Sequence, residues 1–188
     1  MLVTMRVRRD VPNLRSQRVM SGVRLAFAAG KSRFGFRLVH FSVQGNHLHL
    51  IVESTDKRAL SRGMQGLAIR LARQVNGAVG RKGSIFADRY HARALGSPRQ
   101  VRNALAYVLL NRRRHARGVP LQFAEGNVDP CSSAALFDGW VSGFKPRVID
   151  SVGARLGELV VKARSWLLGA GWRRHPRIDP REVPGPGW

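Results

Sequence analysis

One stretch, residues 44–53 (QGNHLHLIVE), restricts the fold more than any other part of the chain. Apolar and polar residues alternate along it, which is typical of a β-strand with one buried face. Successive side chains of a strand point to opposite faces, so His47 and His49 share one face, and Leu48, Leu50 and Val52 share the other. The chain must therefore form a sheet that buries the apolar face and presents two adjacent imidazoles.

The rest of the pattern places this strand in a mixed sheet. We expect strands at 1–9, 36–43, 47–53 and 84–95, and helices at 14–29, 57–79 and 98–115. Thr55-Asp56 is the expected N-cap of the second helix, and Ser97, Pro98 and Gln100 give the third a capping box. The order β-α-β-β-α-β predicts an α+β fold, a ferredoxin-like split β-α-β with an antiparallel sheet. With helices on one face only, the other face would be open to a ligand.

The length of the chain, 188 residues, favours one domain and an appendage. We predict a domain over 1–140 and a basic extension over 141–188, with a helix at 150–168 and a loose proline-rich tail from 175. Trp140, Trp166 and Trp172 are expected in the core rather than as platforms for stacked bases.

The charge indicates the class of partner. Lys and Arg number 33 against 11 Asp and Glu, a net charge of +22. Such a charge in a chain able to fold favours a polyanion, with nucleic acid ahead of an anionic membrane surface; solvated arginines without a partner are the alternative. The candidate DNA contacts are six arginines: Arg58, Arg62, Arg70, Arg112, Arg113 and Arg114. No stretch of about 18 apolar residues and no signal peptide is present, so we expect a cytoplasmic protein.

Two imidazoles at positions i and i+2 of a strand are suited to a divalent metal ion, with Mn²⁺ a better match than Mg²⁺. Asn46 and Glu53 flank the pair and are candidate sources of oxygen ligands. His40, on the neighbouring strand, is a candidate partner for a ligating ring. A structural role for the two histidines is the alternative.

Tyr107 and Asn111 stand four residues apart on the third expected helix and so share one face. This pairing suggests a phenol nucleophile beside an amide that supplies the third metal ligand. Attack by Tyr107 on a phosphodiester would leave a covalent phosphotyrosine and a free hydroxyl, which conserves the bond energy for rejoining. Tyr90 is the rival nucleophile, but its place in a strand favours packing or DNA contact.

These residues carry a resemblance to a known family. HLHLIVE resembles the His-hydrophobic-His motif, and with ALAYVLLNRRRHA (104–116) the chain is similar to single-tyrosine HUH transposases, above all REP-associated tyrosine transposases. GSIFADRYHARAL (83–95) resembles the strand before the tyrosine helix of that family, and the similarity extends over residues 3–140. Arg112 stands where members often have proline, and the chain continues further beyond Trp140 than a minimal domain requires.

The resemblance implies a nuclease and strand transferase for single-stranded DNA, usually folded into hairpins, that acts with Mg²⁺ or Mn²⁺. It implies that Tyr107 forms a 5′-phosphotyrosine and frees a 3′-hydroxyl, and that His47, His49 and Asn111 hold the metal. The family includes monomers and homodimers, and a place at the bacterial nucleoid would follow.

Two other functions compete with this hypothesis. A domain that binds single-stranded DNA or RNA without cutting it would explain the charge, but not the combination of two histidines, a tyrosine and an asparagine. A histidine-triad nucleotide hydrolase also carries alternating histidines on a strand. That motif needs a third histidine at position 51, where this chain has Ile51, and is excluded.

Overall fold

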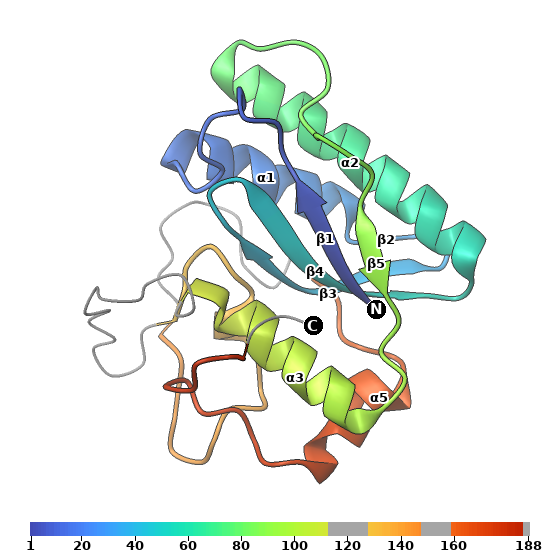
Figure 1. Cartoon of the computed structure of the whole chain (residues 1–188), viewed down its shortest axis with the longest axis vertical. Coiled ribbons are helices and arrows are strands. Elements are labelled where there is room, and N and C mark those ends of the chain that lie inside the picture. Colours follow the sequence, from blue (N-terminus) through green and yellow to red (C-terminus); the bar gives the residue numbers. More distant parts are fainter. Residues whose placement is uncertain (113–127, 148–158, 186–188) are drawn as a thin grey trace.

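A five-stranded antiparallel sheet with the strand order β2-β3-β4-β1-β5 forms the centre of the protein (Figure 1). The computed structural model describes residues 1–112, 128–147 and 159–185. Its strands are β1 (Leu2–Arg6), β2 (Ser32–Arg33), β3 (Phe36–Val43), β4 (His47–Ser54) and β5 (His91–Arg93). Its helices are α1 (Gln17–Gly30), α2 (Lys57–Val79), α3 (Pro98–Leu109) and α5 (Trp166–Gly169), with short 3₁₀ turns η1 (Ala134–Leu136) and η3 (Gly171–Arg174). The order confirms the ferredoxin-like split fold, to which β2 adds an edge strand.

Helices cover both faces of the sheet, so the expectation of one open face is wrong. Leu48, Leu50 and Val52 are buried with α1 and α2 on one side. Ile51 and Leu2 are buried on the other side with the apolar residues of α3. The physical reason lies in β4 itself. Ile51 is an apolar residue on the same face as the two histidines, so other residues must cover it to exclude water.

The two long helices begin where their capping residues predict. The Asp56 carboxylate accepts a hydrogen bond from the Ala59 N–H, and α2 spans residues 57–79 as expected. The Ser97 hydroxyl accepts from the Gln100 N–H, and Pro98 is the first residue of α3. This helix ends at Leu109, six residues before the predicted end.

A glycine in α2 allows the helix to lie close to the sheet. A Cβ atom at Gly63 would stand 2.1 Å from the ring of Phe36 on β3. Any larger residue at this position would therefore push α2 away from the sheet.

The predicted strand at 84–95 is reduced to the three residues of β5 and an isolated bridge between Val7 and Phe86. The helix predicted at 150–168 lies partly outside the described residues, and residues 159–165 are not helical. The division of the chain at residue 140 stays a prediction.

The C-terminal segment, residues 159–185, packs against α3. Leu168, Trp172 and Ile178 join the buried cluster that contains the apolar residues of α3, and Arg102 of α3 forms an ion pair with Glu182. Trp140 and Trp172 are buried as expected, but Trp166 is 54% exposed, so its assignment to the core is wrong. No helix within the described ranges has the length and apolar character needed to cross a bilayer.

Candidate active site

The two histidines lie at the start of β4 with their rings on the α3 side of the sheet. The ring centroids of His47 and His49 are 4.7 Å apart. The Asn46 side-chain oxygen is 2.7 Å from Nδ1 of His47, which leaves Nε2 of that ring as the nitrogen for a ligand. Only 4% of His49 is exposed, so this ring has one well-defined environment.

Partners on both sides orient the ring of His49. Its Nδ1 lies 3.1 Å from the hydroxyl oxygen of Thr4, which pairs directly opposite it on β1. Its Nε2 lies 3.2 Å from the hydroxyl oxygen of Tyr107. Two assignments of protons satisfy both bonds: Nδ1–H donates to Thr4 while Nε2 accepts from the phenol, or Nδ1 accepts from Thr4 while Nε2–H donates to the Tyr107 oxygen. The first leaves on Nε2 the basic lone pair that a ligand to a divalent cation must offer.

Tyr107 comes from the last part of α3, which crosses this end of the sheet. The centroids of its ring and that of His49 are 4.9 Å apart, and the residue is partly buried at the edge of the α3 core. The structure thus brings together residues that stand 58 positions apart in the sequence. The rival Tyr90 packs against the core on the α1 and α2 side instead.

Asn111 lies two residues beyond the end of α3 and is fully buried. Neither its Oδ1 nor its Nδ2 has a hydrogen-bond partner in the part of the chain that the structure describes. An unsatisfied buried polar group costs about 1–3 kcal/mol, so such a group calls for an explanation. A cation bound to the amide oxygen would supply one, and an amide oxygen with two imidazoles is a donor set suited to a divalent metal ion.

Among the described residues, no three His, Cys, Asp or Glu side chains form a group that could hold a metal ion. Glu53, a candidate oxygen ligand by sequence, lies at the other end of β4 and accepts hydrogen bonds from Ser165 and the Arg164 N–H. Burial acts to raise the pKa of Glu53, but these bonds outweigh it and lower that pKa. Its assignment to the metal site is therefore wrong.

His40 also bonds elsewhere. Its Nδ1 lies 3.1 Å from the Ser133 hydroxyl oxygen, and its ring packs edge-on against Phe137. Burial lowers the pKa of His40 to about 4, although Asp138 acts to raise it, so the ring is neutral at pH 7. The structure therefore gives no support to His40 as a partner of the ligating rings.

Three site residues escaped the sequence reasoning. Thr4 and Arg6 on β1 pair directly with His49 and His47, and His91 on β5 pairs with Thr4. Residues paired across an antiparallel sheet share a face, so all three border the candidate site. The alternation along residues 1–9 already placed Thr4 and Arg6 on one face, but only the strand register puts that face beside the histidines.

The arginines predicted to contact DNA fall into two places. Arg112 follows Asn111 and is 45% exposed, 3.9 Å from Asp129. That carboxylate accepts two hydrogen bonds from Arg15, and these bonds hold residue 129 in place near Arg112. Arg113 and Arg114 lie outside the described residues.

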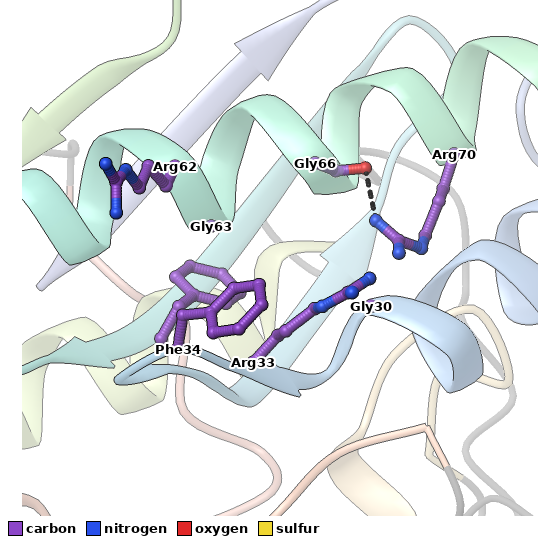
Figure 2. A pocket seen from close by; sticks show the side chains of 8 residues that line it. Gly30, Arg33, Phe34, Arg62, Gly63, Gly66 and Arg70 are labelled. Carbon is purple, nitrogen blue, oxygen red and sulfur yellow. Dashed lines mark hydrogen bonds between the residues drawn. The ribbon is translucent and has the colours of Figure 1, made fainter.

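The other group lies on α2, on the opposite face of the sheet. Arg58 and Arg62 are exposed there, and Arg62 and Arg70 line a cavity of about 400 Å³ (Figure 2). Arg33 and the 74% exposed Phe34, which has a positive φ of 49°, form another wall of the cavity. The structure therefore does not bring these arginines to the histidines.

Comparison with known proteins gives a family. The model of a family described as IS200-like transposases matches residues 2–110. No protein with a curated description matches the chain.

Two solved structures resemble the chain. One is a REP-associated tyrosine transposase bound to a REP hairpin, with 20% identity, a TM-score of 0.49 and 61% of this chain covered. The match spans 66% of that protein, just under two thirds of its length. The other is a presumed transposase from Deinococcus radiodurans R1, with 16% identity and a TM-score of 0.42, over 50% of this chain and 77% of that one.

Proposed function

Because the chain belongs to the family of IS200-like transposases, we propose that it cleaves and rejoins single-stranded DNA by attack of Tyr107. The observation that carries the proposal is the contact between the Tyr107 hydroxyl and Nε2 of His49, 3.2 Å long, beside the second imidazole. A phenol nucleophile and a pair of imidazoles in contact are the components that metal-assisted phosphoryl transfer to a tyrosine requires.

The reaction exchanges one phosphodiester for another. The Tyr107 oxygen forms a bond to phosphorus, the bond from phosphorus to the 3′ oxygen breaks, and the DNA remains attached through its 5′-phosphate. The proton lost by the phenol is balanced by the proton gained by the leaving 3′ oxygen, with solvent as the carrier. The contact at Nε2 of His49 places the Tyr107 hydroxyl next to the nitrogen that would bind the ion, and the phenol would give up that lone pair when the ion binds.

We propose that His47, His49 and the Asn111 amide hold a Mg²⁺ or Mn²⁺ ion. A bound ion of this kind withdraws charge from the scissile phosphate as a Lewis acid. The burial of Asn111 without a partner supports this role more directly than its place in the sequence does. Thr4 supports it as well, because its bond to Nδ1 directs the other nitrogen of His49 toward the ligand position.

The net charge of +22 supports DNA as the partner. By analogy with the transposase solved with a REP hairpin, we propose that the DNA contains a hairpin. Arg112 follows Asn111 in the chain, is 45% exposed and would contact the strand being cut. Arg58, Arg62 and Arg70 lie on α2, on the face of the sheet opposite the histidines. They would therefore contact DNA away from the cleavage site. Both a monomer and a homodimer agree with this proposal.

The alternative is a domain that binds single-stranded nucleic acid without cutting it. Covalent capture distinguishes the two functions. The protein is incubated with Mn²⁺ and a pool of labelled hairpin oligonucleotides with single-stranded flanks, then denatured. We expect a labelled protein band that Tyr107→Phe abolishes and Tyr90→Phe preserves. DNA binding without a covalent band, in a pool that covers many flank sequences, would favour the alternative.

A further inference from the structure

Trp166, in the C-terminal segment, is a large aromatic residue that is 54% exposed. The segment lies outside residues 2–110, which the family model matches. We infer that Trp166 is a stacking platform for an unpaired base of the DNA strand, an inference that rests on the proposed function.

The ring is held in a defined position. A Cβ atom at Gly171 would stand 2.7 Å from the Trp166 ring, so the ring lies directly against the backbone of η3. The guanidinium of Arg174 lies over the same ring, 4.8 Å from its centroid. Gly171 and Arg174, both in η3, therefore hold the ring in place. Just over half of the residue is exposed, which leaves ring surface for a stacked base.

The platform is also fastened to the sheet. Ser165, the residue before Trp166, donates hydrogen bonds from its N–H and its hydroxyl to the Glu53 carboxylate. Arg37 forms an ion pair with the same carboxylate at 3.5 Å. A rigid aromatic ring loses little conformational entropy when a base stacks on it, so this anchoring favours binding.

The charge around the ring matches a polyanion. Residues 159–177 contain five Lys and Arg residues and no Asp or Glu. Lys162, Arg164 and Arg174 are exposed within this segment. Basic side chains around an exposed aromatic ring are the combination by which proteins bind single-stranded DNA without sequence preference.

The position of the platform relative to the catalytic group suggests which DNA it binds. Glu53 stands on the same face of β4 as His47 and His49, and four strand residues from His49 correspond to roughly 13 Å. α5 lies beside the N-terminal end of α3, whereas Tyr107 comes from the other end of that helix (Figure 1). A single strand that leaves the catalytic group along α3 would therefore reach Trp166, and the platform would bind the flank of the cleavage site.

Binding measurements with matched oligonucleotides test this inference. Three fluorescent hairpins are compared by anisotropy with the full chain: one without a flank, one with long single-stranded flanks on both ends, and one with abasic flanks. For the flanked hairpin we expect Trp166→Ala to raise the Kd about 10-fold, and Trp166→Phe to stay within about 3-fold of the wild type. Leu25→Ala is the control, since Leu25 is also 54% exposed but lies on α1, on the other face of the sheet.

The hairpins without bases in the flanks separate stacking from other effects. Trp166→Ala should bind the hairpin without a flank, and the one with abasic flanks, as the wild type does. An unchanged Kd for the flanked hairpin would overturn the inference and leave a protein partner or a second copy as the occupant of this surface. An equal loss for all three hairpins would also overturn it, because that result indicates a damaged fold.

The wild-type protein provides a measurement that needs no variant, because abasic flanks alone should raise its Kd about 10-fold. The covalent band described above separates the two proposals. If that band forms but base removal and Trp166→Ala leave binding unchanged, only the platform is refuted. If the chain binds none of the hairpins and forms no band, the proposed function fails.

Discussion

Replacing Thr4 by valine tests whether β1 orients the metal ligand. Valine has nearly the shape of threonine but cannot accept the Nδ1–H of His49, a bond that is 3.1 Å long in the structure. Without that partner, the neutral ring can move its proton to Nε2, where no lone pair remains for a cation. Loss of such a supporting hydrogen bond typically costs 10- to 100-fold in metal affinity, or about 1.4–2.8 kcal/mol.

Calorimetry measures the binding of Mn²⁺ as the ion is titrated into the protein. ¹⁵N NMR of the His49 ring identifies the protonated nitrogen. We expect Thr4→Val to raise the Kd for Mn²⁺ 10- to 100-fold and to shift the ring toward the Nε2–H form. Thr4→Ser keeps the hydroxyl and should stay within about 3-fold of the wild type. If valine binds Mn²⁺ as tightly as threonine, or serine as weakly as valine, the reasoning about Thr4 is refuted.

Three further predictions concern stability. Asn111→Leu should raise the free energy of unfolding by about 1–3 kcal/mol, because it removes buried polar atoms without partners. The same change should abolish Mn²⁺ binding. If urea titrations show a loss of stability instead, the amide is satisfied in solution. His40 has a folded pKa of about 4, below its ordinary 6.5, because it is buried. As the pH falls, the unfolded chain therefore takes up the proton first. The free energy of unfolding, which has its full value at pH 7, should fall by up to about 3 kcal/mol between pH 6.5 and 4. Urea titrations of His40→Gln should show a flatter dependence of stability on pH, and a dependence identical to that of the wild type would contradict the assignment. Arg15→Met should lower the free energy of unfolding by about 3 kcal/mol, since the Asp129 side chain is only 3% exposed and loses its closest cation. Arg81→Met is its control, because the partner Asp10 is 53% exposed and the change should cost little.

The sequence was sufficient for those elements that depend on local signals. Alternation along 47–53 predicted the strand and the shared face of His47 and His49, because the period of a strand admits no other arrangement. The caps at Asp56 and Ser97 predicted where α2 and α3 begin. The spacing of Tyr107 and Asn111 predicted a common helix face, which stays a prediction because α3 ends at Leu109, but the structure shows that Tyr107 contacts His49. The chemical roles of these four residues remain predictions.

Contacts between distant parts of the chain could not be predicted in this way. Glu53 suggested a metal ligand by its nearness in sequence, yet it bonds to Ser165, which is 112 residues away. The cover over the histidine face depends on α3 and the C-terminal segment, whose packing no local pattern describes. Trp166 looked like a core residue for a related reason, because hydrophobicity alone does not distinguish a buried ring from one exposed on a basic surface.

The residue that becomes attached to DNA is the most direct test of the account. The chain has only two tyrosines, Tyr90 and Tyr107, and trypsin separates them into peptides 90–93 and 103–112. The covalent complex formed with Mn²⁺ is trimmed with nuclease, digested and examined by mass spectrometry. We predict a nucleotide joined through its 5′-phosphate to Tyr107 in peptide 103–112. A nucleotide on Tyr90 or on any other residue would contradict the account.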